Sequence, residues 1–123
     1  MISIDSHGWI ERFTNGTKAT AYNRVIDSHK PEELLTSVVV LYEVYKKVKS
    51  IKGEEKALEA VAVLSQTKVV ALDQTLSLEA ADYSLEHGLH MAGAVIYATS
   101  RQYSAELYTA DEDLKGLKGV TLV

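Results

Sequence analysis

The sequence predicts a three-layer α/β/α domain with a mostly parallel central sheet of four to five strands. Three observations predict it: short apolar runs alternate with helical segments, no linker rich in proline, glycine or serine divides the chain, and no segment is repeated. Strands that alternate with helices favour a parallel sheet covered by helices on both faces. The length of 123 residues suits one domain, and we expect it to span residues 1–123.

The first element is a short apolar run, Ile2–Ile4, which we predict to be a strand. A helix is predicted over Gly8–Phe13, and Asp5 or Ser6 has the side chain to cap its N-terminus. The sequence Asn15-Gly16-Thr17 then breaks the pattern. The opening of the chain therefore predicts a strand followed directly by a capped helix.

Two more helices and a strand are predicted before Gly53. A second helix ends near His29, and its apolar residues recur with helical spacing at Ala21, Tyr22, Val25 and Ile26. Pro31 lies in the connection to a predicted strand at Leu34–Thr36. A third helix is predicted from about Val38 to Ser50. Its apolar stripe is Leu41, Val44, Tyr45, Val48 and Ile51.

The segment after Gly53 predicts a helix, a strand at Lys68–Leu72 and a further helix. Asp73 or Thr75 is placed to cap the second of these helices, and Gly88 stands where a C-terminal cap is expected. The apolar residues that mark these helices are Leu58, Val61 and Leu64 in the first and Leu78, Ala81 and Leu85 in the second.

The last third of the chain predicts a buried helix and two strands. Residues Ala92–Ser100 are apolar nearly all round, which is typical of a helix in the centre of a protein. Strands are predicted at Ala105–Thr109 and Val120–Val123, with a helical turn around Asp113–Gly116 between them. The alternation of strands and helices thus continues to the end of the chain.

Composition limits the classes of function. The chain has no cysteine, which excludes disulfides and thiolate metal sites and fits a cytoplasmic protein. No stretch approaches the roughly 20 apolar residues of a membrane span, and Met1 leads directly into the first apolar run, so we expect no signal peptide. The formal net charge is -4, whereas proteins that bind nucleic acid by overall charge are basic.

One local cluster of positive charge stands out in the acidic chain. It consists of Lys46, Lys47 and Lys49 in the predicted third helix and of Lys52 and Lys56 beyond it. Such a cluster is either a solvated helix face or a patch that holds nucleic acid phosphates. We name Lys46, Lys47 and Lys49 as the candidate nucleic-acid contacts.

Three acidic residues are expected to meet at one edge of the sheet. Asp5 and Asp111 each follow a predicted strand, and Glu43 lies in the first turns of the helix after the second strand. Ligands of open parallel sheets bind beyond the carboxyl ends of the strands. Carboxylates gathered there repel one another unless a cation compensates them, and oxygen ligands suit Mg²⁺ or Mn²⁺. Such an ion activates water for phosphodiester hydrolysis.

Each acid also has a purely structural interpretation. Asp5 could only cap the first helix, and Glu43 could only pair with Lys47 four residues on. Asp111 lies in an acidic sequence that suits any turn. For Asp113 we favour a role as the cap of the following helical turn over a metal role. Taken singly, none of these residues predicts a function.

Together, four segments in order resemble the PIN domain, and most closely the VapC-type toxin of VapBC toxin–antitoxin systems. Ile4–Ile10 is similar to the family opening, in which an aspartate is followed by Ser or Thr and an aromatic–aliphatic helix. Val40–Val44 resembles the helix that carries the glutamate. Leu89–Thr99 and Leu107–Leu114 resemble the segments of the third and fourth acids, and Gly119–Val123 resembles the closing strand.

The resemblance implies a Mg²⁺- or Mn²⁺-dependent endoribonuclease that acts on RNA as a homodimer. It also implies a cognate antitoxin protein that lays a peptide across the active site. Carried over by position, Asp5, Glu43, Asp111 and position 93 would form the metal and catalytic set. The supporting residues implied around them are Ser6 and Thr109, which could hydrogen-bond a carboxylate or a phosphate, and Asp113.

The chain departs from the family at Gly93, where an aspartate is expected. Loss of one carboxylate should weaken metal binding and misplace the attacking water, so we expect impaired activity. Glycine near the start of a helix costs roughly 0.5–1 kcal/mol relative to alanine, whereas aspartate there favours the helix dipole. Since an aspartate codon becomes a glycine codon by a single-base change, we hypothesise that an aspartate was lost here.

Two alternatives remain beside the ribonuclease. A catalytically inactive PIN domain could act as an RNA- or protein-binding module, which Gly93 supports, although a site long out of use should also lose its mutually repelling acids. An unrelated α/β domain such as a phosphate-transfer receiver would place a pair of acids after its first strand. Asp5 stands alone there, which disfavours the receiver.

Overall fold

Five strands pair side by side, all parallel, in the order β3-β2-β1-β4-β5 in the computed structural model, which describes residues 1–123. The strands are β1 (Ile2–Ile4), β2 (Leu34–Ser37), β3 (Lys68–Val70), β4 (Glu106–Thr109) and β5 (Val120–Leu122). The helices are α1 (Ser6–Thr14), α2 (Ala19–Ile26), α3 (Val38–Lys52), α4 (Glu54–Leu64), α5 (Gln74–His87) and α6 (Met91–Gln102). Short 3-10 turns occupy Pro31–Glu33 and Glu112–Leu114. The predicted α/β class is confirmed.

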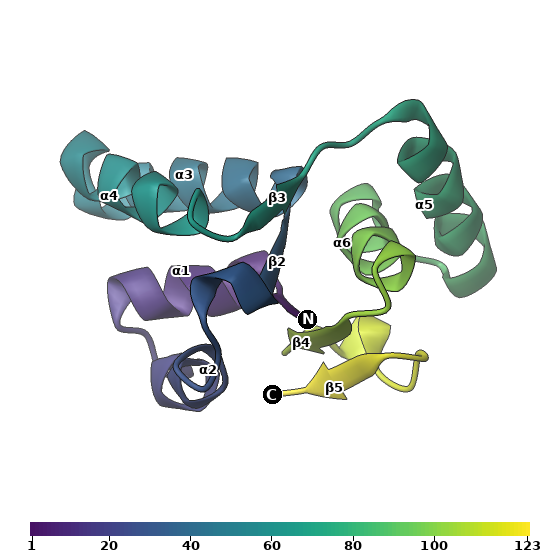
Figure 1. Cartoon of the computed structure of the whole chain (residues 1–123), viewed down its shortest axis with the longest axis horizontal. Helices are drawn as coiled ribbons and strands as arrows, with labels where there is room; N and C mark the ends of the chain where they lie inside the picture. Colours follow the sequence, from purple (N-terminus) through teal and green to yellow (C-terminus); the bar gives the residue numbers. More distant parts are fainter.

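Helices cover both sides of the sheet (Figure 1). Helices α1 to α4 pack with one another on one side, and α5 packs on α6 on the other. The α6 helix is buried without interruption over Ala94–Ser100, as its sequence predicts. Its two buried hydroxyls donate to carbonyls of their own helix, Thr99 Oγ1 to Val95 O at 2.7 Å and Ser100 Oγ to Ile96 O at 3.0 Å. The polar groups in this central helix are therefore satisfied.

Short polar side chains begin three of the helices. Asp5 caps α1, Ser37 caps α3 and Asp73 caps α5, each by accepting a hydrogen bond from a backbone N–H of the first turn. Gly88 ends α5 in the left-handed conformation, with φ of 66°, where a glycine is favoured. Asp5, Asp73 and Gly88 are among the caps that the sequence predicts, because caps depend on local chemistry, whereas Ser37 is a cap that the prediction did not include.

Several of the apolar residues that mark the predicted helices do not face the core. Ile51 of α3, Leu58 of α4 and Leu78 and Leu85 of α5 are exposed, Leu85 to 87 %. The faces that are buried carry Val40, Val44 and Val48 in α3, Ala57, Ala60 and Leu64 in α4, and Leu76 and Ala80 in α5. Small side chains let packed helices approach closely, so alanine faces replace the leucine stripes where α4 meets α3 and α5 meets α6.

The sheet brings the ends of two strands together at the position where its order reverses. β1 pairs with β2 on one side and β4 on the other, and Ile4 stands opposite Tyr108. The Asp5 N–H extends this pairing by donating to the Tyr108 carbonyl at 3.2 Å. Residues that follow β1 and β4 therefore emerge side by side, where parallel sheets bind ligands. No helix combines the length and apolar character needed to cross a membrane.

Candidate active site

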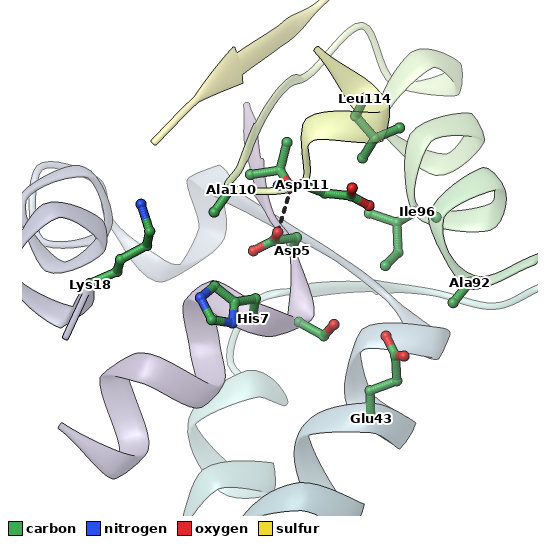
Figure 2. Close-up of a pocket in the computed structure, with 12 residues that line it drawn as sticks. Asp5, His7, Lys18, Glu43, Ala92, Ile96, Ala110, Asp111 and Leu114 are labelled. Carbon is green, nitrogen blue, oxygen red and sulfur yellow. Dashed lines mark hydrogen bonds between the residues drawn. The ribbon is translucent and has the colours of Figure 1, made fainter. Parts of the chain in front are cut away.

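A hollow of about 420 Å³ lies at this edge of the sheet and is lined by residues from five parts of the chain (Figure 2). Asp5 enters it from the end of β1, Asp111 from the segment after β4 and Glu43 from α3. Gly93, in the first turn of α6, completes this set. The three carboxylates named from the sequence and the position of the absent one therefore share one hollow.

Asp5 is the most constrained of the three acids. Its residue is only 6 % exposed, and both carboxylate oxygens accept hydrogen bonds. Gly8 N–H donates to Oδ1 at 2.8 Å and Thr109 Oγ1 donates to Oδ2 at 2.5 Å. Burial raises the pKa of the Asp5 carboxyl above its ordinary value, against the lowering effect of these hydrogen bonds. Asp5 is thus both the cap of α1 and part of the hollow.

Asp111 is exposed and begins the 3-10 turn after β4. Its Oδ1 accepts from the Asp113 N–H at 2.9 Å, and its own N–H donates to Thr109 Oγ1 at 3.0 Å. The Thr109 hydroxyl therefore links Asp111 to Asp5. The expectation that Asp113 caps this turn is wrong, because the turn begins at Glu112 and leaves Asp111 at the cap. Asp113 is exposed and does not line the hollow.

Glu43 faces the hollow from the opposite side and is unpaired. Its carboxylate points into the hollow in Figure 2, and the side chain makes no ion pair. The pair with Lys47 considered from the sequence does not form. Half-buried on α3, Glu43 lies beside the inward-facing Val40 and Val44. This carboxylate is therefore free to meet a ligand.

Gly93 occupies a place that has room for a side chain. A Cβ built there meets no atom within 4 Å, and the backbone is not in the left-handed region that favours glycine. The first turn of α6 also lacks both an acidic residue and a side-chain cap at His90. An aspartate at position 93 would fit without strain and would stabilise the helix through its dipole. Nothing in the local structure requires the glycine.

The side chains that line the hollow have the right chemistry to bind a divalent cation, but they do not lie close enough together to hold one. Three carboxylates line the hollow without Cys or another soft ligand, which suits Mg²⁺ or Mn²⁺. However, no three acidic or histidine side chains lie close enough together to hold a metal ion. Asp5 and Asp111 stand on one wall, which the strand ends form. Glu43 and Gly93 belong to the helices of the other wall, and Gly93 supplies no side chain.

A second hollow of about 350 Å³ continues along α3 from the first. Ser6 and Glu43 line both, and Lys46 and Lys47 line the second one. Lys49 lines neither, because its ammonium group pairs with Glu54 at 3.4 Å. Two of the three candidate nucleic-acid contacts therefore lie next to the carboxylates, and the third faces the start of α4.

Two residues at the rim of the first hollow were not singled out from the sequence. His7 pairs with Glu11 at 3.3 Å, and Lys18 Nζ donates to the Val123 carbonyl at 3.3 Å (Figure 2). His7 stands two residues after Asp5, but the spacing of the four histidines along the chain does not indicate a metal site. Lys18 precedes α2 in an irregular segment, where no periodic pattern indicates which way a side chain faces.

Comparison with known proteins relates this chain to one protein family and to several solved structures. The model of the PIN domain family matches residues 2–120. A chain of a toxin–antitoxin complex from Klebsiella pneumoniae has a TM-score of 0.83 at 22 % identity, over 98 % of this chain and 96 % of that one. VapC20 of Mycobacterium tuberculosis, a toxin that cleaves the sarcin–ricin loop, has a TM-score of 0.77 at 18 % identity, over 94 % and 92 %.

A third similar structure is VapBC2 of Rickettsia felis bound to a DNA fragment from its promoter. Its TM-score is 0.73 at 14 % identity, over 100 % of this chain and 98 % of that one. No curated protein matches the sequence significantly. At these identities, the structural matches establish the fold, and the family rests on the match to its sequence model.

Proposed function

Since the chain belongs to the PIN domain family, a family of nucleases, we propose that it is built as a Mg²⁺- or Mn²⁺-dependent endoribonuclease toxin of the VapC type whose metal site is one carboxylate short. One observation carries this proposal: Asp5, Glu43 and Asp111 line a single hollow together with Gly93, where a side chain has room. The expected family is confirmed by its model. The ribonuclease activity and the metal requirement are our inference.

In this proposal Asp5, Glu43 and Asp111 hold the divalent cation, which supplies an activated water and stabilises charge on the phosphate. The hydrogen bonds from Gly8 and Thr109 fix the Asp5 carboxylate before any ligand arrives. Glu43 has no competing ion pair, so it can orient the attacking water or accept its proton.

The cations around the hollow suit the phosphates on either side of the bond to be cut. Lys46 and Lys47 line the continuation of the site along α3, and Lys18 lies at the other rim. Because the chain carries a net charge of -4, RNA binding must depend on such local groups. The Ser6 hydroxyl, between the two hollows, is placed to hydrogen-bond a phosphate or a carboxylate.

The direct test is Mn²⁺-dependent cleavage of a panel of RNAs by the chain, by Gly93→Asp and by Gly93→Asn. Restoring a carboxylate should increase the rate by roughly 10²–10³-fold, since the ion stabilises the transition state by several kcal/mol. Gly93→Asn has nearly the same size without the charge and should behave like the chain itself. Adding Asp5→Asn to Gly93→Asp should abolish cleavage.

A different outcome would change the proposal. If the chain with Gly93 already cuts as fast as Gly93→Asp, and Asp5→Asn abolishes that activity, three carboxylates suffice and the glycine is not disabling. If neither cuts any RNA of the panel, the second candidate function gains support.

That second candidate is a catalytically inactive PIN domain that binds RNA or a protein. The absence of any three acidic or histidine side chains placed to hold a metal favours it. It predicts that the chain binds RNA as tightly after Asp5→Asn as before, and that Gly93→Asp does not cut. The ribonuclease proposal predicts cleavage by Gly93→Asp in the same samples.

The proposal includes protein partners. The neighbours from Klebsiella pneumoniae and Rickettsia felis are toxin–antitoxin assemblies, and we expect a cognate antitoxin and a homodimer for this chain too, in the cytoplasm. Light scattering should then give a mass near twice the 13.5 kDa of one chain. A mass of 13.5 kDa over a range of concentrations would contradict the homodimer.

A further inference from the structure

One tyrosine beneath the hollow has no role in the site described so far. Tyr22 of α2 is completely buried, and its hydroxyl is among the few buried polar atoms without a hydrogen-bond partner of good geometry. Buried polar groups are nearly always paired, so an unpaired one needs a physical explanation. The other polar tyrosine atom in the core, the Tyr97 hydroxyl, follows the rule and donates to the Lys118 carbonyl at 2.9 Å.

The ring of Tyr22 lies directly on the backbone of Gly8. A Cβ at position 8 would come within 2.5 Å of the Tyr22 ring and 2.6 Å of the Ile4 side chain, so only glycine leaves room for this contact. Gly8 is also the residue whose N–H binds Asp5 Oδ1. The chain therefore uses the glycine to place the tyrosine against the same first turn of α1 that holds the carboxylate.

Two groups of opposite kind lie nearest the Tyr22 hydroxyl. The Asp5 carboxylate is an acceptor, whereas the backbone N–H of Ala110 is a donor. Burial, followed by the negative charge of Asp5, raises the pKa of the Tyr22 hydroxyl far above its ordinary value, so the hydroxyl keeps its proton and can donate it to the Asp5 carboxylate. The Tyr22 hydroxyl makes no hydrogen bond in this structure, so its proton is free for the Asp5 carboxylate.

On the basis of the proposed function, we propose that Tyr22 is a positioning residue whose hydroxyl donates to the Asp5 carboxylate and fixes the orientation in which Asp5 meets the cation. A carboxylate offers about four acceptor positions. Gly8 and Thr109 use one on each oxygen. Tyr22 takes a third from beneath, so the remaining lone pair is directed into the hollow.

Buried packing alone is the competing explanation, and the two differ in what Tyr22→Phe does. If Tyr22 only fills the core, removing its unpaired hydroxyl should leave the thermal midpoint unchanged or raise it, and should not affect metal binding. If it positions Asp5, the same substitution should weaken Mn²⁺ binding by roughly 10-fold, the lower end of what the loss of a residue that orients a ligand costs.

The experiment compares Tyr22→Phe with Tyr97→Phe, both made in the Gly93→Asp protein, by calorimetric titration with Mn²⁺ and by thermal unfolding. Tyr97→Phe is the matched control, because it also removes one buried hydroxyl but lies outside the hollow. We expect Tyr22→Phe to lower the Mn²⁺ affinity and to keep the thermal midpoint. Tyr97→Phe should keep the Mn²⁺ affinity and lower the thermal midpoint. An affinity of Tyr22→Phe within twofold of its parent overturns the proposal.

A second measurement separates failure of this inference from failure of the proposed function. The proton of a buried tyrosine hydroxyl exchanges slowly enough to be sought by NMR in the chain as it stands, without metal. Its resonance, assigned by its loss in Tyr22→Phe, should move strongly in Asp5→Asn and little in Tyr97→Phe. If Gly93→Asp binds no Mn²⁺, the proposed function fails, and an unmoved resonance in Asp5→Asn would overturn the Tyr22–Asp5 contact by itself.

Discussion

The two walls of the hollow are built in different ways. On the strand wall, Asp5 is buried, capped onto α1 and held by Thr109, whose own hydroxyl accepts from the Asp111 N–H. On the helix wall, Glu43 has no ion pair and Gly93 has open space around it. The strand wall is thus part of the folding core, whereas the helix wall carries groups that can change at little cost to the fold.

This difference explains how a site can lose one ligand and keep the others. Replacing Asp5 with an apolar residue would leave the Gly8 N–H and the Thr109 hydroxyl without their acceptor, so stability alone selects for a polar residue there. No such cost attaches to position 93. Retention of Asp5 is therefore weaker support for catalysis than retention of Glu43, which the fold does not require.

Thr109→Val should have the largest effect of the substitutions that test this contrast between the walls. Valine has nearly the shape of threonine but cannot make the hydrogen bonds that join the residues of the strand wall. The substitution removes the donor to Asp5 Oδ2 and the acceptor of the Asp111 N–H. We expect a stability loss of about 1–3 kcal/mol and, in the Gly93→Asp protein, roughly 10–100-fold weaker Mn²⁺ binding.

Thr36→Val is the control for that substitution, since the Thr36 hydroxyl is buried against Thr67 outside the hollow. It should lose stability in denaturant titrations and leave Mn²⁺ binding unchanged. Equal Mn²⁺ affinities for Thr109→Val and its parent would show that the strand wall does not depend on this hydroxyl.

The next effect should come from Gly8→Ala. The added methyl would lie 2.5 Å from the Tyr22 ring, so the ring or α1 must move, at a cost of about 1–3 kcal/mol typical of overpacking. Gly93→Ala adds the same methyl on the other wall, where it meets no atom within 4 Å, and should be neutral or stabilising. Thermal unfolding of the two variants decides, and a similar shift in both would contradict the contrast between the walls.

A smaller effect is expected from pH. Burial raises the pKa of Asp5 above the value of 3.8 that it has in an unfolded chain, so the folded protein holds this proton more tightly. The stability contributed by the proton is full below pH 3.8 and is lost as the pH rises through the raised pKa of the folded state. Asp5→Asn keeps a capping side chain but cannot titrate.

Denaturant titrations over a series of pH values can isolate this contribution. The difference in unfolding free energy between Asp5→Asn and its parent should shift in favour of the variant as the pH rises from below 3.8. Parallel stability curves for the two proteins would mean that Asp5 is not desolvated as the structure indicates.

The smallest effect should be a difference in the salt dependence of RNA binding between substitutions of two lysines of α3. Lys47 lines the hollow that continues from Glu43, whereas Lys49 is paired with Glu54. Lys47→Gln should reduce the salt dependence of RNA binding by about one unit of slope, as expected for one lost phosphate contact. Lys49→Gln should leave the slope unchanged in the same fluorescence titrations, and equal slopes for both variants would remove Lys47 from the RNA path.

The sequence predicts the fold well where local chemistry decides. Strands, caps at Asp5 and Asp73 and the buried α6 all follow from apolar runs, polar side chains before helices and the glycine at Gly88. The buried faces of α4 and α5 could not be predicted in this way. Alanine becomes a core residue only where a second helix packs closely against it. That condition depends on packing between distant segments.

The candidate site shows the same division. Asp5, Glu43 and Asp111 could be named from their positions after strands and early in a helix, and all three line the hollow. Lys18 and Tyr22 could not, because each comes to the site through the path of α2 across α1. The sequence places Asp111 in a turn and predicts Asp113 as its cap. The observed turn begins two residues earlier than this prediction requires, so Asp111 is the cap.

The central claim is that the hollow is a cation site with one missing ligand, and Mn²⁺ titration calorimetry tests it most directly. The chain, Gly93→Asp and Gly93→Asn should be compared in one buffer. We predict that Gly93→Asp binds Mn²⁺ at least about tenfold more tightly than the other two, the effect of a change of about 1.4 kcal/mol. Equal affinities for all three proteins would contradict the claim, because position 93 would then take no part in holding the ion.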